Sequence, residues 1–253
     1  MDATWTPPER IEEKVKSWLV PPRLYIRYLH QKMKTRGEAE LHLVQHLVTR
    51  DKVALDIGAN KGTYSYELAR HCEAVHAFEP NPKMFAILRR WARKPVQVHN
   101  LALSDQSGQA ELRVPRSARG YSNQMGSLSA VTVTGDYKAV TVPTRRLDDW
   151  VADQNLGPVG FIKIDVEGFE MAVLRGAEQT LRRDRPNLLI ELEERHTHSP
   201  LPDLIAEVCG YGYQAYVMLG GALRPFSDLD LVRHHRQPAR KTDYIFNFIF
   251  LPT

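Results

Sequence analysis

The segment with the most distinct chemical character is a glycine-containing turn after a short apolar run. Residues 53–57 are apolar except for Asp56, and the sequence continues as Gly58-Ala59-Asn60-Lys61-Gly62. An apolar run that ends in glycines is typical of a buried parallel strand, and glycine allows a sharp turn and a close approach of a ligand to the backbone. Since ligands of open α/β sheets bind beyond the carboxyl ends of the strands, this turn is a candidate binding site.

Glu79 supplies the second part of that site. It follows residues 74–78, the next predicted strand, and stands 21 positions after Gly58. A carboxylate at this place can accept hydrogen bonds from both hydroxyls of a ribose, as an acidic residue does in dinucleotide-binding folds. The dinucleotide loop has the form GxGxxG, whose middle glycine lets a pyrophosphate sit on the helix N-terminus. Here that position is Asn60, and Asp56 would repel a pyrophosphate but can support an amino group. The pattern favours S-adenosyl-L-methionine (SAM) over NAD.

Three further acids follow the later strands. Asp165 ends the predicted strand 161–165, Glu167 lies just beyond it, and Glu191 ends residues 187–191. Methyl transfer from a sulfonium mainly requires alignment of the acceptor oxygen, and a general base for a hydroxyl adds roughly 10²–10⁴ in rate. We predict these three as catalytic residues, with Asp165 first and Glu167 second. Helix capping is the alternative for Glu167, and Lys163 shares the face of Asp165 and either pairs with it or caps the sheet.

A metal-assisted O-methyltransferase is the alternative mechanism. Asp165 and Glu191 could hold Mg²⁺ together with an asparagine or water, because hard cations take oxygen ligands. The main prediction includes no metal ligand. His42 and His46 have the spacing of one helical face, but no third ligand is apparent near them.

The acceptor is expected to meet residues outside the central strands. Residues 105–150 break the α/β alternation with two strand-like runs, 109–114 and 139–142, and inserts of this size are often lids or binding loops. We predict that this β insert covers the active site and that Asn123, Ser127 and His196 bind the acceptor. A basic tract that includes Arg233 and Arg236 would receive an anionic acceptor, or is a solvated loop.

The elements that position these residues alternate between strand and helix from residue 51 to residue 253. Besides the strands already given, residues 96–98 form a strand, helices start near Tyr64 and at Pro82, and Gly176 divides a helical stretch into two. Residues 201–209 form a helix. Residues 213–218 and 244–251 are predicted to form an antiparallel hairpin at the sheet edge.

Residues 1–50 are predicted to be a helical extension of this domain. Four residues at helical spacing, Ile11, Val15, Trp18 and Leu19, precede a break at Pro21-Pro22, and a second helix is expected over residues 38–48. Residues 23–34 mix basic and apolar side chains. We predict a cap that packs on the domain; a membrane-surface helix is the alternative.

Composition excludes several classes. The 253 residues are 43% hydrophobic and 25% charged, as in an ordinary globular protein. The net charge of +4 is spread along the chain, which argues against a nucleic-acid partner. The two cysteines form no CxxC pair, and no run approaches the 18 or more apolar residues of a membrane span. A cytoplasmic protein is expected, and a homodimer is left open.

Several segments together resemble the FkbM-type methyltransferases, a class I SAM-dependent family. The resemblance covers about residues 50–195 and rests on the turn 55–62 and on four further segments: Phe78-Glu79-Pro80-Asn81, residues 100–105, residues 142–149, and Lys163-Ile164-Asp165-Val166-Glu167-Gly168-Phe169-Glu170. It implies an α/β, Rossmann-like, mostly parallel sheet of seven strands, SAM as cofactor, and O-methylation of a hydroxyl or carboxylate on a natural product, sugar or related metabolite.

The resemblance also implies a set of cofactor residues by their positions. It places Ser104 and Asp105 near the adenine. The predicted cofactor set is Asp56, Gly58, Ala59, Asn60, Gly62, Glu79, Pro80, Asn81, Ser104, Asp105 and Asp165. A protein or RNA methyltransferase is a further alternative, but the loop after Asp165 is acidic and lacks the stacking aromatic of an Asn-Pro-Pro-Tyr type loop, and RNA recognition favours a basic, aromatic-rich face.

Overall fold

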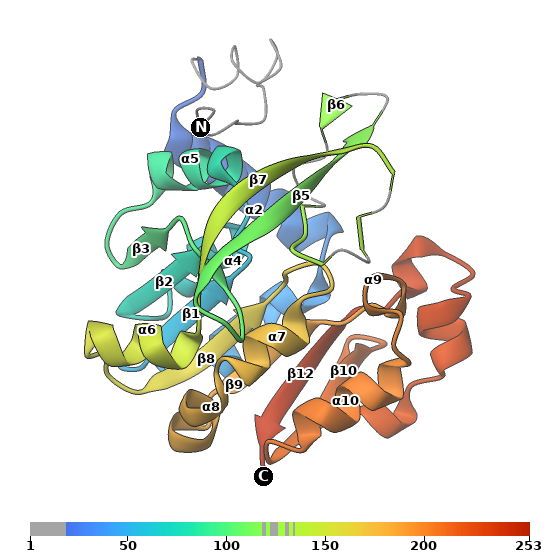
Figure 1. Ribbon diagram of the computed structural model, residues 1–253. Helices are drawn as coiled ribbons and strands as arrows, with labels where there is room; N and C mark the ends of the chain where they lie inside the picture. The colour runs from blue at the N-terminus through green and yellow to red at the C-terminus, as the bar shows by residue number, and fades with distance from the viewer. Residues whose placement is uncertain (1–18, 118–119, 122–125, 130–131, 134) are drawn as a thin grey trace.

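The computed structural model describes residues 19–117, 120–121, 126–129, 132–133 and 135–253. Its centre is a mostly parallel sheet with helices on both faces (Figure 1). Five parallel strands run in the order β9, β8, β1, β2, β3, and three antiparallel strands extend the β9 side in the order β12, β10, β11. Their bounds are β1 Val53–Ile57, β2 Ala74–Phe78, β3 Val96–His99, β8 Val159–Ile164, β9 Asn187–Glu191, β10 Tyr213–Leu219, β11 Ala222–Pro225 and β12 Asn247–Pro252. The predicted Rossmann-like α/β class is confirmed.

The antiparallel edge corrects two details of the prediction. The sheet has eight strands rather than seven, because β11 adds a strand beyond β10. The tight hairpin is β10–β11, turned by Gly220 and Gly221, both with positive φ; two such residues suit a two-residue hairpin turn. Residues 213–218 and the last strand do pair antiparallel, but a long connection separates them, and residues 244–246 precede β12.

Each face of the sheet carries its own hydrophobic core, since parallel strands are buried on both sides. Along β1, Leu55 and Ile57 pack toward one core and Ala54 toward the other. The first core is covered by α6 Leu147–Gln154, α7 Glu170–Arg175, α8 Glu178–Asp184 and α10 Leu201–Cys209. The second is covered by α2 Pro22–Arg36, 3₁₀ helix η1 Ala39–His42, α3 Val44–Leu47, α4 Thr63–Leu68 and α5 Pro82–Trp91. Pro82 opens α5, and α7 and α8 are separate helices, as predicted.

A second, four-stranded sheet accounts for the predicted β character after residue 100. Its order is β4, β7, β5, β6, with bounds β4 Ala102–Leu103, β5 Gly108–Ser117, β6 Gly120–Tyr121 and β7 Tyr137–Arg145. Leu112, Val114, Val140 and Val142 form a small core within it. Residues 147–150, which the sequence assigned to the insert, begin α6 and pack Leu147 and Trp150 against the central sheet.

The N-terminal region packs on the second face of the sheet. Pro22 begins α2 instead of ending a helix, because proline is tolerated in a first turn, and the helix expected over residues 38–48 is divided into η1 and α3. Ile11, Val15 and Trp18 lie outside the described residues, and Leu19 is exposed. Buried Glu67 on α4 contacts His30 Nε2 at 2.7 Å and Lys34 Nζ at 3.2 Å, which fastens α2 to the domain.

The C-terminal region contains short helical segments between its strands: α9 Glu194–Thr197, two 3₁₀ turns over residues 226–228 and 241–243, and a π-helical turn over residues 232–236. Within the part of the chain that the structure describes, no helix combines the length and apolar character needed to cross a membrane.

Candidate active site

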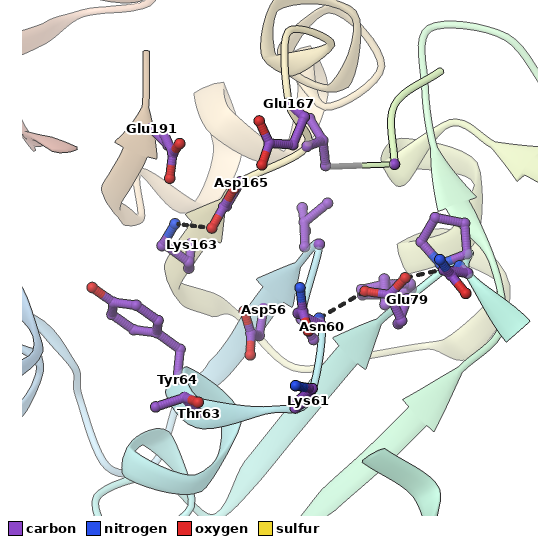
Figure 2. A pocket seen from close by; sticks show the side chains of 18 of the residues that line it. Asp56, Asn60, Lys61, Thr63, Tyr64, Glu79, Lys163, Asp165, Glu167 and Glu191 are labelled. Atoms are coloured by element: carbon purple, nitrogen blue, oxygen red, sulfur yellow. Dashed lines mark hydrogen bonds and ion pairs between the residues drawn. The ribbon is translucent and has the colours of Figure 1, made fainter. Parts of the chain in front are cut away.

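One cavity of about 490 Å³ lies at the carboxyl ends of β1, β2, β8 and β9 (Figure 2). Its walls bring together most of the residues that the sequence predicted for the site: Asp56, Gly58, Ala59, Asn60, Glu79, Pro80, Asn81, Asp165, Glu167 and Glu191. These residues come from four strand ends and the loops after them. The topology rather than proximity in sequence therefore assembles the site.

Five predicted residues do not line this cavity. Gly62 packs on α5 instead, and Ser127 and His196 contact Glu167 from behind. Ser104 and Asp105, expected near the adenine, lie outside the wall, and the preceding residues 101–103 line it. The chain lines the cavity just before the residues that the motif suggested, because β4 ends at Leu103 and the backbone N–H of Ser104 donates to Arg145 O. Asn123 lies outside the described residues.

Gly58 is the point where two backbone segments meet. Its φ of +80° lies in the left-handed region, and a Cβ atom placed there would be 1.7 Å from the carbonyl oxygen of Asp165. The backbone N–H groups of Gly58 and Ala59 both donate to Phe78 O. No residue with a side chain fits this crossing. Gly62 meets a different constraint, since a Cβ there would be 2.4 Å from Leu88 on α5.

Glu79 is held at the opposite end of the turn. Its carboxylate accepts the backbone N–H of Asn60 at 2.7 Å and of Asn81 at 2.8 Å. Two backbone donors leave about two lone pairs free for the hydroxyls of a ribose. Asn81 adds a buried side-chain amide whose Nδ2 has no hydrogen-bond partner among the described residues. An unpaired buried donor beside a carboxylate fits a nucleoside that supplies the acceptor.

Burial raises the pKa of Glu79 to about 7, although the N–H groups of Asn81 and Asn60 oppose the shift. The ionised form is the one that accepts ribose hydroxyls, so protonation competes with binding. We expect the dissociation constant of S-adenosylhomocysteine (SAH), measured by calorimetry, to be about tenfold larger at pH 6 than at pH 8. Glu79→Gln should bind SAH weakly and with no such pH dependence. Equal wild-type affinity at the two pH values would contradict this role.

Asp56 and Lys163 face each other on neighbouring strands. Asp56 is buried, accepts the hydroxyl of Ser65 at 2.5 Å, and lies in register with Lys163 of β8. Burial raises the pKa of Asp56 to about 6. Lys163 is almost fully buried, and its Nζ lies 3.3 Å from Asp165 Oδ2 and 5.1 Å from the centre of the Tyr64 ring. Of the two predicted roles of Lys163, the structure shows the pairing with Asp165 (Figure 2).

Asp165, Glu167 and Glu191 converge on one end of the cavity, opposite Glu79 (Figure 2). The side chain of Asp165 pairs with Lys163, and its backbone N–H donates to Ile57 O at 3.0 Å. Burial, followed by the charges of Asp165 and Glu193, raises the pKa of Glu167 to about 8. Burial and Asp165 also raise the pKa of Glu191. Carboxylates whose pKa is raised toward neutrality are typical of sites that handle protons or cations.

Part of the cavity wall comes from a region for which the sequence predicted no site. Leu29, Met33 and Glu38 line the cavity from α2 and the turn after it. Glu38 Oε2 accepts the hydroxyl of Tyr64 at 2.6 Å and the side-chain amide of Asn247 at 3.0 Å. The apolar spacing of residues 23–34 predicted a packed cap, and α2 does pack on α4 and α5. No local pattern indicated which side chains of this helix face a cavity.

The basic tract near the C-terminus is largely paired within itself or with neighbouring acids. Arg236 makes two hydrogen bonds to the carboxylate of Glu194, and Arg240 makes two to Asp243. None of the tract's residues lines the cavity. The structure therefore brings no cation of the tract to the predicted acceptor end.

The residues of the cavity fit a sulfonium nucleoside. Glu79 and the unpaired amide of Asn81 suit a ribose and its neighbouring polar atoms, and the bare backbone at Gly58 permits close approach. Six carboxylates line the cavity, Glu38, Asp56, Glu79, Asp165, Glu167 and Glu191, against three lysines, Lys32, Lys61 and Lys163. Such an excess favours a positively charged ligand over a pyrophosphate.

Comparison with known proteins gives a consistent result. Residues 56–215 match the family model described as the methyltransferase FkbM domain. A stretch of 159 residues is 28% identical to 2-O-methyltransferase NoeI of Sinorhizobium fredii and covers 56% of this chain and 64% of NoeI, just under two thirds of that protein. A stretch of 192 residues is 30% identical to 31-O-demethyl-FK506 methyltransferase FkbM of Streptomyces tacrolimicus and covers 64% and 72% of the two chains.

Among solved structures, the fold is similar to that of methyltransferase FkbM from Methylobacillus flagellatus KT. The TM-score is 0.49 at 18% sequence identity, and the similar region covers 94% of this chain and 60% of the other.

Proposed function

This chain belongs to the FkbM methyltransferase family, as its motifs predicted, and on that premise we propose that it methylates a hydroxyl oxygen of a small molecule. SAM is the methyl donor, and the sheet is that of a class I SAM-dependent methyltransferase. Of the two relatives named above, one is called a 2-O-methyltransferase and the other a methyltransferase of 31-O-demethyl-FK506. The acceptor of this chain is therefore argued from its own cavity.

The observation that carries the proposal is the group of three carboxylates opposite Glu79. Because Glu79 holds the ribose at one end, the acceptor meets the sulfonium from the end where Asp165, Glu167 and Glu191 lie. In their ionised form these acids would repel a carboxylate or phosphate acceptor, and in their neutral form they offer it no positive charge. A hydroxyl can donate a hydrogen bond to one of them and lose its proton there. The cavity thus supports a neutral hydroxyl acceptor over an anionic one.

Asp165 is the best placed of the three to take the proton. Its backbone crosses Gly58 in the turn that receives the sulfonium end of the cofactor, so its side chain starts from the point closest to that turn. The ammonium of Lys163 holds its carboxylate in place. SAM supplies an activated methyl group. Alignment of the two reactants can lower the activation barrier by about 7–11 kcal/mol. Glu167 and Glu191 then border the acceptor.

The second sheet and the N-terminal region close the cavity in this proposal. Leu112, Gly126 and Leu128 line it from the insert, and Ser127 Oγ donates to Glu167 O at 2.6 Å. We assign residues 105–150 the role of a lid over a catalytic domain of residues 51–253, with residues 1–50 as an extension of which residues 29–38 contribute to the wall. A cover of this kind excludes water from the reacting sulfonium.

The test is transfer of an isotopically labelled methyl group. The protein is incubated with methyl-labelled SAM and a small-molecule extract, and the products are separated before and after mild alkali. A methyl ether survives alkali whereas a methyl ester is hydrolysed, so the proposal expects alkali-stable label in the small-molecule fraction. Label that is lost in alkali, or label confined to protein or RNA, would show that the acceptor is wrong.

A further inference from the structure

Three side chains from three segments meet beside the catalytic end of the cavity. Glu167 lies in the loop after β8, Glu191 ends β9, and His196 belongs to α9. One ligand atom from each lies within 4.8 Å of the other two. His196 is 8% exposed, and its Nδ1 lies 3.1 Å from Glu167 Oε2. Two carboxylates and one imidazole at these separations can surround a single ion.

The charges around this cluster are not balanced. Among the described residues, Lys163 pairs with Asp165 and Arg195 pairs with Glu193. The carboxylate of Glu191 accepts no hydrogen bond from any residue that the structure describes, and the charged contact of Glu167 is with His196. Two carboxyl groups therefore share a partly enclosed space with one imidazole, so the cluster holds more acidic than basic side chains.

Hydrogen bonds and close backbone packing hold the segments that carry the cluster. Ser127 Oγ donates to Glu167 O at 2.6 Å, and Thr132 Oγ1 donates to His196 O at 2.9 Å. Gly168, with a φ of +91°, lets the loop after β8 pack on α9, because a Cβ there would be 2.7 Å from His196 O. The insert and one glycine thus hold two of the three side chains in position, as outer contacts do around metal ligands.

We propose that Glu167, Glu191 and His196 bind one divalent transition-metal cation such as Mn²⁺. An imidazole with two carboxylates suits first-row transition metals, whereas Mg²⁺ and Ca²⁺ prefer oxygen ligands alone. Three protein ligands leave coordination positions open, and the two glutamates face the cavity. The sequence suggested a metal site at Asp165 and Glu191. The proposed site does not include Asp165, because the carboxylate of Asp165 forms an ion pair with Lys163. Its role in positioning the acceptor oxygen rests on the proposed function, but binding of the ion does not.

Titration of metal-free protein with MnCl₂ tests the site. The full chain is treated with EDTA and dialysed, and free Mn²⁺ is followed by electron paramagnetic resonance. The wild type should bind one Mn²⁺ per chain, and Glu191→Gln and His196→Gln should each weaken binding at least about tenfold. Glu73→Gln, which removes an exposed carboxylate outside the cavity, should leave Mn²⁺ affinity unchanged.

SAH binding, measured by calorimetry on the same samples, shows whether each variant is folded and separates the two hypotheses. Wild-type protein that binds SAH but not Mn²⁺ would overturn the metal site and leave the methyltransferase proposal intact. Mn²⁺ affinity that is the same in the wild type, Glu191→Gln and His196→Gln would overturn it too. Mn²⁺ binding without SAH binding would count against the assigned cofactor site alone.

Discussion

Gly58→Ala should weaken SAH binding by about a hundredfold, a loss of close to 3 kcal/mol. The new Cβ would lie 1.7 Å from Asp165 O at a φ of +80°, so the turn or the end of β8 must move. Either movement displaces Asn60, whose N–H holds Glu79, and so disturbs the ribose site along with the sulfonium site. The dissociation constant of SAH by calorimetry measures the effect.

Gly157→Ala is the matched control for this substitution. A Cβ at Gly157 meets no atom within 4 Å, so that variant should bind SAH as the wild type does. Thermal unfolding of both variants separates a local effect from global loss of structure. If Gly58→Ala retains wild-type SAH affinity, the cofactor does not occupy this turn.

Asp165→Asn should reduce the rate constant of methyl transfer by about 10²–10⁴ while SAH affinity changes little. An amide of the same shape keeps the side chain in place but cannot take the proton of the acceptor hydroxyl. The measurement is single-turnover transfer from labelled SAM to the acceptor that the labelling experiment isolates. The separation of rate from affinity distinguishes a proton acceptor from a residue that only shapes the cavity.

Asp203→Asn on the exposed side of α10 is the control, since Asp203 lies outside the cavity wall. It should leave both the transfer rate and SAH affinity unchanged. A transfer rate in Asp165→Asn within a few fold of the wild type would assign the proton to another group or show that the acceptor needs no base. A variant that loses SAH affinity and rate together would place Asp165 in cofactor binding.

The sequence predicted those parts of the site that lie at the carboxyl ends of strands. Gly58 and Glu79 each follow a short apolar run, and the carboxyl ends of parallel strands lie at one edge of a sheet, so their meeting follows from topology. The same reasoning placed Asp165 and Glu191 in the cavity. The bounds of β1, β2, β9 and α10 also agree with the apolar runs from which they were predicted.

The parts that escaped prediction depend on contacts between distant segments. Glu38 lies 209 positions from Asn247, and no pattern in either segment indicates that they share a hydrogen bond. Ser104 resembled a cofactor residue by motif, but it follows β4, whose position is set by parallel pairing with β7, a strand within the insert and far along the sequence. Strand β11 is short and exposed, so it lacks the buried apolar face that makes a strand recognisable.

The contact between Gly58 and Asp165 O has a consequence for how acceptors can differ among related enzymes. In the proposed function, main-chain atoms place the turn that would meet the methyl group directly beside the acid that would accept the proton, so a change in one would disturb the other. New acceptors must then be accommodated by the surfaces around this turn and this acid, which α2 and the insert provide from outside the shared strands. Related enzymes with different acceptors would then differ in these surrounding surfaces and keep the same reaction centre.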